Sequence, residues 1–221
     1  MTTRLLMAGL VVFGGWQIGH SGYLLAKAEL AQWLLEQAWQ EMQLARKEAM
    51  RLQGDAVDFH VDGLAPWPWA DTWPMARMHW PSLQQDQIVL AGASGRNLAF
   101  GPAHLSASVL PGEVGVSVIG GHRDTHFAFL QDVMIGDQFV LETAEGIRIG
   151  FQVKEIHITD VRHSRIALDA SIPKIALVAC YPFVDWEAGS PLRYLVIAEA
   201  LGQKFEQVPP TTAEMLTTMS L

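Results

Sequence analysis

Three side chains that can act together on a carbonyl group stand beside apolar runs in this chain of 221 residues. Cys180 and Arg193 each border one run, and His122 follows a third run and two glycines. Short apolar runs of this kind predict buried β-strands, so a thiol, an imidazole and a guanidinium would stand at three strand ends. A thiolate can attack a carbonyl carbon, and an imidazole can carry the protons involved. The pattern therefore indicates acyl transfer through a thiol.

Cys180 is the single cysteine of the chain, so no disulfide can form within the chain. A cysteine thiol titrates near about pH 8.5 and attacks as its thiolate, which a nearby imidazolium or guanidinium favours. On its own, a cysteine that ends a buried strand is most often a small apolar side chain. The joint placement with His122 and Arg193 is what favours catalysis.

A metal site built on the same segment is the alternative use of these residues. His122 and His126 are four residues apart, and Asp124 and Cys180 would complete a set of metal-ligand types. The two glycines before His122 predict a turn, which does not place both histidines on one helix face. We therefore expect no metal site and no other cofactor. Asp124 is expected to orient His122 or to cap the segment that follows.

Composition limits the classes of function that need to be considered. The chain holds 23 acidic and 15 basic residues, which gives a formal net charge of −8. A broad nucleic-acid surface needs clustered Lys and Arg to neutralise phosphates, so nucleic acid is not an expected partner. Half of the residues are hydrophobic, which is enough for one main domain with a sizeable core and an appendage.

The N-terminal residues 1–25 are expected to anchor the chain in a membrane. Arg4 precedes an apolar stretch, which predicts that the start stays in the cytoplasm and that the rest is exported. The stretch is long enough to cross a bilayer, although five glycines and two polar residues dilute it. The alternative is a cleaved signal peptide, because Ala26 and Ala28 form a small-x-small site. Both alternatives export the domain.

Residues 26–54 are expected to form a stalk helix, because good helix formers dominate and no Pro or Gly interrupts them before the last residue. Leu35, Trp39 and Met42 share one face of this helix, and Gln43 lies on a more polar face. We expect the apolar face to pack on the domain. A coiled-coil dimer is the alternative.

Residues 66–81 are rich in proline and tryptophan. Alternating Pro and Trp exclude a regular helix, so this segment is expected to run in extended form over the surface. Its four tryptophans either hold the loop onto the core or form an exposed platform for a sugar or a peptide. The first interpretation is favoured, because tryptophans pack more often than they bind.

The rest of the chain alternates short apolar runs with turn residues. This spacing predicts an all-β sandwich or barrel in a domain at 55–201, with a hairpin turn at Glu145 and Gly146. The clearest strands are expected at 87–91, 114–119, 139–143, 147–158, 175–180 and 194–200.

Two short helices and a tail complete the expected elements. Residues 103–109 and 127–133 are each expected to form one short helix within the β-domain. The polar segment 202–221 contains two adjacent prolines and is expected to be a flexible tail.

An ordered set of motifs in this domain resembles the sortases. Arg193 follows Cys180 by thirteen residues, and a Gly-His-Arg-Asp motif at 121–124 stands upstream. Within that family, the set is most similar to the Gram-negative subgroup called class GN or marine proteobacterial sortase. The resemblance covers about residues 67–201. Its motifs lie at 67–74, 98–102, 121–130, 180–183 and 191–194.

The resemblance implies a mainly β fold, an eight-stranded barrel behind an N-terminal anchor and a stalk helix. It implies a single-pass protein of the cytoplasmic (inner) membrane whose catalytic domain faces the periplasm or the exterior. Such transpeptidases cut a C-terminal sorting signal, similar to Leu-Pro-x-Thr-Gly, of an exported protein and pass the acyl group to an amine. By position, Cys180 would be the nucleophile, His122 the general acid and base, and Arg193 the cation that stabilises the oxyanion or orients substrate.

One departure from the family pattern concerns the strand before the nucleophile. The family usually has Thr-Leu-x-Thr-Cys, whereas this chain has alanines at positions 176 and 179, so both threonine hydroxyls are absent. The resemblance implies that substrate lies between this strand and the segment 161–173. Ala179, Ala91 and Leu98, together with Ala103, are the expected substrate-binding residues.

Two further functions stay open. A thiol peptidase would resolve the same thioester with water instead of an amine. A non-enzymatic, membrane-tethered β-domain would bind peptides through its tryptophan-rich segment, and its function would survive the change Cys180→Ala.

Overall fold

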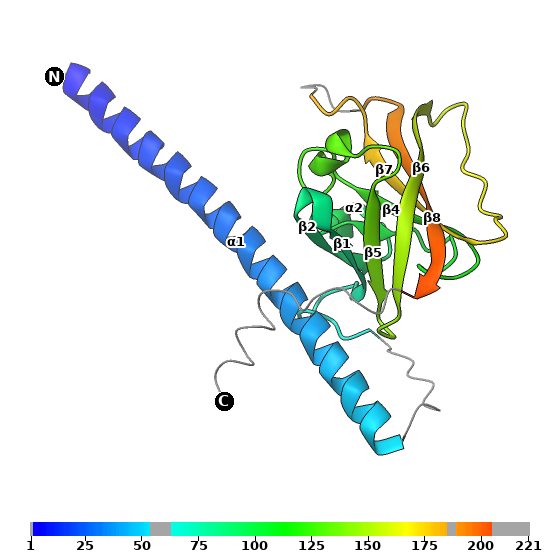
Figure 1. Cartoon of the computed structure of the whole chain (residues 1–221). Helices are drawn as coiled ribbons and strands as arrows, with labels where there is room; N and C mark the ends of the chain where they lie inside the picture. Colours follow the sequence, from blue (N-terminus) through cyan, green and yellow to red (C-terminus); the bar gives the residue numbers. More distant parts are fainter. Residues whose placement is uncertain (1, 54–62, 185–188, 205–221) are drawn as a thin grey trace.

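A long N-terminal helix lies along one side of a closed β-barrel (Figure 1). The computed structural model describes residues 2–53, 63–184 and 189–204. The elements are α1 (Thr2–Gln53), β1 (Pro74–Trp80), η1 (Pro81–Leu83), β2 (Gln85–Ala91), α2 (Gly95–Leu98), β3 (Ala103–His104), β4 (Gly115–Gly121), η2 (Ala128–Asp132), β5 (Gln138–Thr143), β6 (Arg148–Asp160), β7 (Pro173–Cys180) and β8 (Leu192–Lys204).

The eight strands close in the order β1-β2-β3-β4-β7-β8-β6-β5, and β5 pairs with β1 to complete the ring. Two neighbouring pairs, β2 with β3 and β4 with β7, are parallel, and the others are antiparallel. The expected eight-stranded barrel is therefore confirmed. Closure pairs every strand with two neighbours, although the two-residue β3 meets only the ends of β2 and β4.

Aromatic rings fill the barrel interior. The indole of Trp80 stacks on Phe139 with ring centroids 4.3 Å apart, and Phe139 stacks on Phe151 at 5.4 Å. All three side chains are fully buried, as is Phe127. Large rings of this kind supply much of the apolar area that a small barrel can bury.

Six of the strands lie where apolar runs predicted them, namely β2 and β4 to β8. The short helix expected at 127–133 is the 3-10 helix η2. The prediction of a helix at 103–109 is wrong. β3 and a turn occupy this segment, because Leu105 N–H donates to the Val118 carbonyl at 2.8 Å and Ser108 Oγ donates to the Leu105 carbonyl at 2.7 Å. These polar contacts replace the bonds of a helix.

The tryptophan-rich segment is extended, as expected, only in its second half, which is the strand β1. Its first half turns instead, because Ala70 N–H donates to the Trp67 carbonyl at 2.9 Å. Pro74 stands first in β1, a position that tolerates the missing N–H. Trp80 is buried in the barrel and Trp67 packs on the Phe100 ring at 4.8 Å, so these two hold the segment to the domain. Trp69 and Trp73 remain 79% and 40% exposed.

The stalk helix docks on the barrel through the face that the apolar pattern predicted. Leu35 is fully buried against Leu90 and Ala103, while Trp39 and Met42 pack on Ala144. α1 starts at Thr2, so the expected anchor and stalk are one continuous helix.

Polar contacts border this interface. Gln32 Nε2 donates to the Phe100 carbonyl at 2.5 Å, and Arg46 Nη1 donates to the Glu145 carbonyl at 2.9 Å. Gln43 was expected on a polar face but is buried, because its Nε2 reaches the Ala144 carbonyl at 3.4 Å.

The predictions of an anchor at one end of the chain and a flexible tail at the other rest on composition. No helix in the described ranges combines the length and the hydropathy needed to cross a bilayer. The anchor at 1–25 stays a prediction. β8 continues to Lys204, past the expected domain end at 201, and the rest of the expected tail lies outside the described residues, as do residue 54 of the stalk and residues 55–62.

Two tryptophans of α1 give a matched test of the docking. Trp39 is 3% exposed and Trp33 is 56% exposed. Trp39→Ala should lower the free energy of unfolding by about 3 kcal/mol, because it leaves a cavity at the interface. Trp33→Ala should change it by about 0.5 kcal/mol or less. Urea unfolding of the two variants measures the difference, and equal losses would show that α1 does not dock through this face.

Candidate active site

The parallel ladder between β4 and β7 brings His122 and Cys180 to the same edge of the barrel. Ile119 pairs with Leu177 and Gly121 pairs with Ala179, so the next residue of each strand leaves the ladder in step. In a parallel pair both chains run in one direction. The imidazole and the thiol therefore stand on adjacent strands at the same level.

Arg193 lies next to Cys180, on β8, which pairs with β7 on the side opposite β4. β7 and β8 are antiparallel, and Cys180 lies directly opposite Arg193 in their ladder. Directly opposite residues project their side chains to the same face of a sheet. His122, Cys180 and Arg193 are thus brought together in one row across β4, β7 and β8.

This row lies on the outer face of the barrel, as strand alternation requires. Along β7, Ile175, Leu177 and Ala179 face the aromatic core, and Ala176, Val178 and Cys180 face outward. The outward side chains of the three strands form an apolar surface that we call the outer floor. Its members are Val116, Val118, Ala176, Val178, Leu195 and Ile197.

The segment 161–172 covers part of the outer floor. Ile166, Leu168 and Ala170 pack on it, and the Leu168 carbonyl accepts from Val116 N–H at 2.9 Å. Val161 N–H donates to the Pro191 carbonyl at 3.0 Å, which ties the start of the segment to the chain just before Arg193. The outer floor thus leads to Cys180 with this segment as its wall.

Backbone carbonyls orient the guanidinium of Arg193. Its Nη1 donates to the Ser190 carbonyl at 2.7 Å and to the Leu192 carbonyl at 2.8 Å. Its Nε and Nη2 make no hydrogen bond within the described part of the chain. These remaining donors can meet an oxygen of a bound substrate.

Phe127 holds the loop that carries His122. Phe127 N–H donates to the His122 carbonyl at 2.9 Å. The Phe127 ring lies so close to Gly121 that a Cβ there would stand 2.5 Å from it, so position 121 needs glycine. The His122 side chain is exposed and Cys180 is half-buried, which leaves both open to a peptide.

His126 lies beside His122 and is half-buried. Burial lowers the pKa of His126 and the nearby His122 lowers it further, while the Ala99 carbonyl and Asp124 oppose the shift. His126 is therefore expected to stay neutral. Within the described residues, no three His, Cys, Asp or Glu side chains are arranged to hold a metal ion.

An aromatic cluster that sequence reasoning missed follows Cys180. The Tyr181 and Tyr194 rings stack at 6.2 Å, and Phe183 meets Tyr194 edge-on at 5.1 Å. Burial raises the pKa of Tyr194, and Tyr181 adds to the shift. Arg123 Nη1 donates at 2.5 Å to the carbonyl of Pro182, which lies between Tyr181 and Phe183 in the sequence. The motifs at 180–183 and 191–194 were the only sequence signal of this cluster.

The four expected substrate-binding residues lie in different parts of the barrel. Ala179 is 1% exposed and faces the core, so its backbone, not its methyl group, borders the thiol. Leu98 borders the outer face of β4, since its Cδ2 would lie 3.8 Å from a Cβ on Gly120. Ala103, which pairs with Gly120, is buried under α1.

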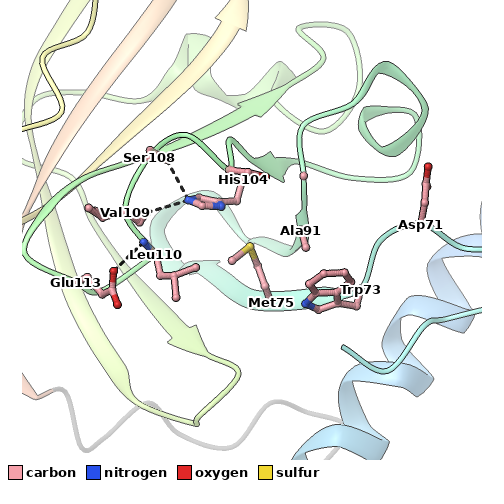
Figure 2. A pocket seen from close by; sticks show the side chains of 11 residues that line it. Asp71, Trp73, Met75, Ala91, His104, Ser108, Val109, Leu110 and Glu113 are labelled. Carbon is pink, nitrogen blue, oxygen red and sulfur yellow. Dashed lines mark hydrogen bonds between the residues drawn. The ribbon is translucent and has the colours of Figure 1, made fainter. Parts of the chain in front are cut away.

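Ala91 lines a different cavity of about 470 Å³, which Figure 2 shows. His104 forms part of its wall, and the His104 Nε2 lies 2.8 Å from the Val109 carbonyl. Because β3 is antiparallel to β4, the segment after His104 runs toward the start of β4, whereas His122 follows its end. This cavity and Cys180 are therefore at opposite ends of β4.

Comparison with known proteins gives one family. A family model described as Sortase domain matches residues 78–201. Sortase D of Bacillus subtilis (strain 168) is 29% identical over 117 residues, which cover 52% of this chain and 58% of that protein. The chain thus matches less than two thirds of the length of this relative.

Solved structures share the fold. A lid mutant of sortase A from Corynebacterium diphtheriae has a TM-score of 0.54 and 25% identity, covering 66% of this chain and 77% of that chain. A Clostridium perfringens sortase D5 transpeptidase has a TM-score of 0.59 and 16% identity, covering 79% and 99%. A lid mutant of Streptococcus agalactiae sortase C1 has a TM-score of 0.54 and 24% identity, covering 61% and 72%.

Buried His104 should make the fold sensitive to acid. Burial lowers its pKa below the ordinary 6.5, and the Val109 carbonyl and Glu113 offset this only in part. The unfolded chain therefore binds the proton more readily, so the stability present above about pH 6.5 falls as pH decreases toward the folded pKa. A tenfold difference in proton affinity between the folded and unfolded chains corresponds to about 1.4 kcal/mol of stability.

His104→Gln keeps an N–H for Val109 and removes the titration. Its melting temperature should fall less than that of the wild type between about pH 7.5 and 5.5. His126, whose pKa is lowered as well, leaves a residual slope in both proteins. Thermal melts across this range measure the two slopes, and identical slopes would contradict the assignment to His104.

Proposed function

The chain belongs to the sortase family, and from this premise we propose that it is a cysteine transpeptidase whose nucleophile is Cys180. The observation that carries the proposal is the row of His122, Cys180 and Arg193 across three adjacent strands on the outer face. In this row a thiol stands between a proton carrier and a fixed cation. Thiol acyl transfer needs a nucleophile, a proton carrier and a donor for the oxyanion, and these three groups can supply them.

In the first half of the reaction, the Cys180 sulfur bonds to the carbonyl carbon of the scissile peptide bond, and the thiol proton passes to His122. The carbonyl electron pair moves to oxygen, where the free donors of Arg193 stabilise the negative charge. One such donor is worth about 3 to 4 kcal/mol in well-studied enzymes. Collapse breaks the carbon–nitrogen bond, and protonated His122 gives its proton to the departing amine. A thioester remains on Cys180.

In the second half, an amine attacks the thioester carbon and His122 accepts its proton. The carbon–sulfur bond breaks and the thiol is restored, so no redox partner is consumed. Water resolving the same thioester would make the enzyme a peptidase. The two outcomes differ only in which nucleophile reaches the acyl group.

The substrate is proposed to be an exported protein with a C-terminal sorting signal similar to Leu-Pro-x-Thr-Gly. The wall at 161–172 and the two partly exposed members of the outer floor, Val178 and Ile197, support this, because an extended peptide with apolar side chains fits an apolar surface that ends at a thiol. Within the family, the motifs at 67–74 and 180–183 support the class GN subgroup.

The thioester is directly testable with the full chain. Incubation with a peptide that carries the sorting signal should add the mass of the acyl fragment to the wild type and nothing to Cys180→Ala. Arg193→Lys should lower the rate of adduct formation by about 100-fold, because a fixed guanidinium donor is lost. Intact-mass spectrometry follows the adduct, and its absence in the wild type would sink the proposal.

Adding an amine separates the alternatives. A transpeptidase should yield ligated product in proportion to amine concentration, whereas a peptidase yields the free acid at every amine concentration. If Cys180→Ala retains full function in cells, the peptide-binding module is the correct interpretation instead.

We also propose that residues 1–25 hold the protein in the cytoplasmic membrane with the barrel outside. Arg4 ahead of the apolar stretch supports this orientation. α1 supports it as well, because one helix continues from this stretch into the part that docks on the barrel.

Deletion of residues 2–25 tests the location. The full chain should sediment with membranes and resist carbonate extraction, and the deleted form should not. A reporter that is active only outside the cytoplasm, fused after residue 204, should be active in the full chain alone. A full chain that stays in the soluble fraction would contradict the proposed anchor.

A further inference from the structure

Arg123 links the two sides of the candidate site. It follows His122 directly in the chain, and its Nη1 donates to the carbonyl of Pro182, two residues past Cys180, at 2.5 Å. We propose that Arg123 is a positioning residue that fixes where the His122 imidazole stands relative to the Cys180 thiol. This inference rests on the proposed function.

The ladder between β4 and β7 does not by itself set the separation between the His122 imidazole and the Cys180 thiol. The last pair between β4 and β7 joins Gly121 to Ala179, so His122 stands one residue beyond the paired backbone. The bond from Phe127 to the His122 carbonyl ties this loop to its own continuation and not to β7. The guanidinium of Arg123 crosses from the loop to the chain that leaves β7.

The far end of this link is itself fixed. Tyr181 N–H donates to the Leu192 carbonyl at 3.1 Å, next to Arg193. Tyr181 and Phe183, on either side of Pro182, both pack on the Tyr194 ring. A guanidinium bound to a carbonyl held in this way stays in place, because charge-assisted hydrogen bonds are shorter and stronger than neutral ones.

Arg123 and Arg193 therefore have different tasks. Arg193 is the cross-strand partner of Cys180 and keeps donors free for substrate. Arg123 is half-buried and directs a donor to the protein backbone. Loss of Arg123 should slow the chemical step, which depends on the alignment of imidazole and thiol, and should leave peptide binding on the outer floor largely intact.

The test compares Arg123→Gln, Arg123→Lys and the wild type as full chains, with the sorting-signal peptide and an amine. Arg123→Gln should lower kcat by about 10- to 100-fold, because a small misplacement of reacting groups can cost about 100-fold. KM should change by less than about threefold. The lysine ammonium can still donate to Pro182, so Arg123→Lys should recover much of the lost kcat.

A second readout needs no peptide. The rate at which iodoacetamide alkylates Cys180 at one fixed pH should fall several-fold in Arg123→Gln and recover in Arg123→Lys, because the thiolate loses its aligned partner. Arg148→Gln is the matched control. Arg148 is also half-buried and hydrogen-bonded, to Glu142 at 3.1 Å, on the β5–β6 hairpin, and its loss should change neither rate.

The outcomes of these experiments decide whether Arg123 is a positioning residue. Unchanged kcat and alkylation in Arg123→Gln would overturn the positioning role, provided that Cys180→Ala is inactive. A loss of activity that lysine does not rescue, with a lowered melting temperature, would show a general structural role and also overturn it. If the wild type forms no thioester, the proposed function fails, and the alkylation rates still judge Arg123 separately.

Discussion

The register of the parallel ladder between β4 and β7 is the constraint on which the site depends. Side chains alternate along a strand, so a slip of one residue would turn Cys180 into the aromatic core and bring Ala179 to the surface. Ile119 and Leu177, paired and fully buried, fix the register because both must face the interior. The same hydrophobic packing that closes the barrel therefore decides which residue at the end of β7 faces outward, and Arg193 faces the same side because it pairs with Cys180.

Much of this arrangement could be predicted from local pattern. Short apolar runs predict strands, and the polar residues beside them predict that His122, Cys180 and Arg193 stand at three strand ends. β3 could not be predicted, because its two residues take their conformation from Leu90 and Gly120, which lie elsewhere in the sequence. The contact between Arg123 and Pro182 could not be predicted from the sequence either, because the two loops that carry these residues meet only once the barrel has closed.

The two alanines that replace the family's threonines lie on opposite faces of β7. Ala176 belongs to the outer floor and is fully buried in it, so the missing hydroxyl leaves a wholly apolar contact between β7 and the segment 161–172. Ala179 belongs to the aromatic core, where a hydroxyl would need a buried partner to avoid a desolvation cost. The two replacements thus affect packing on opposite faces of β7, against the segment 161–172 at position 176 and within the aromatic core at position 179.

The continuous α1 helix has a mechanical consequence. A helix rises about 1.5 Å per residue, so the part before Ala31, the first of the side chains described as buried, is about 43 Å long. A flexible linker would let the barrel rotate freely about its attachment, but a helix docked through Leu35 and Trp39 does not. Under the proposed membrane anchoring, a docked helix of this length fixes both the distance and the orientation of the Cys180 thiol relative to the membrane, so the proposed capture of a peptide depends on its direction of approach as well as its distance.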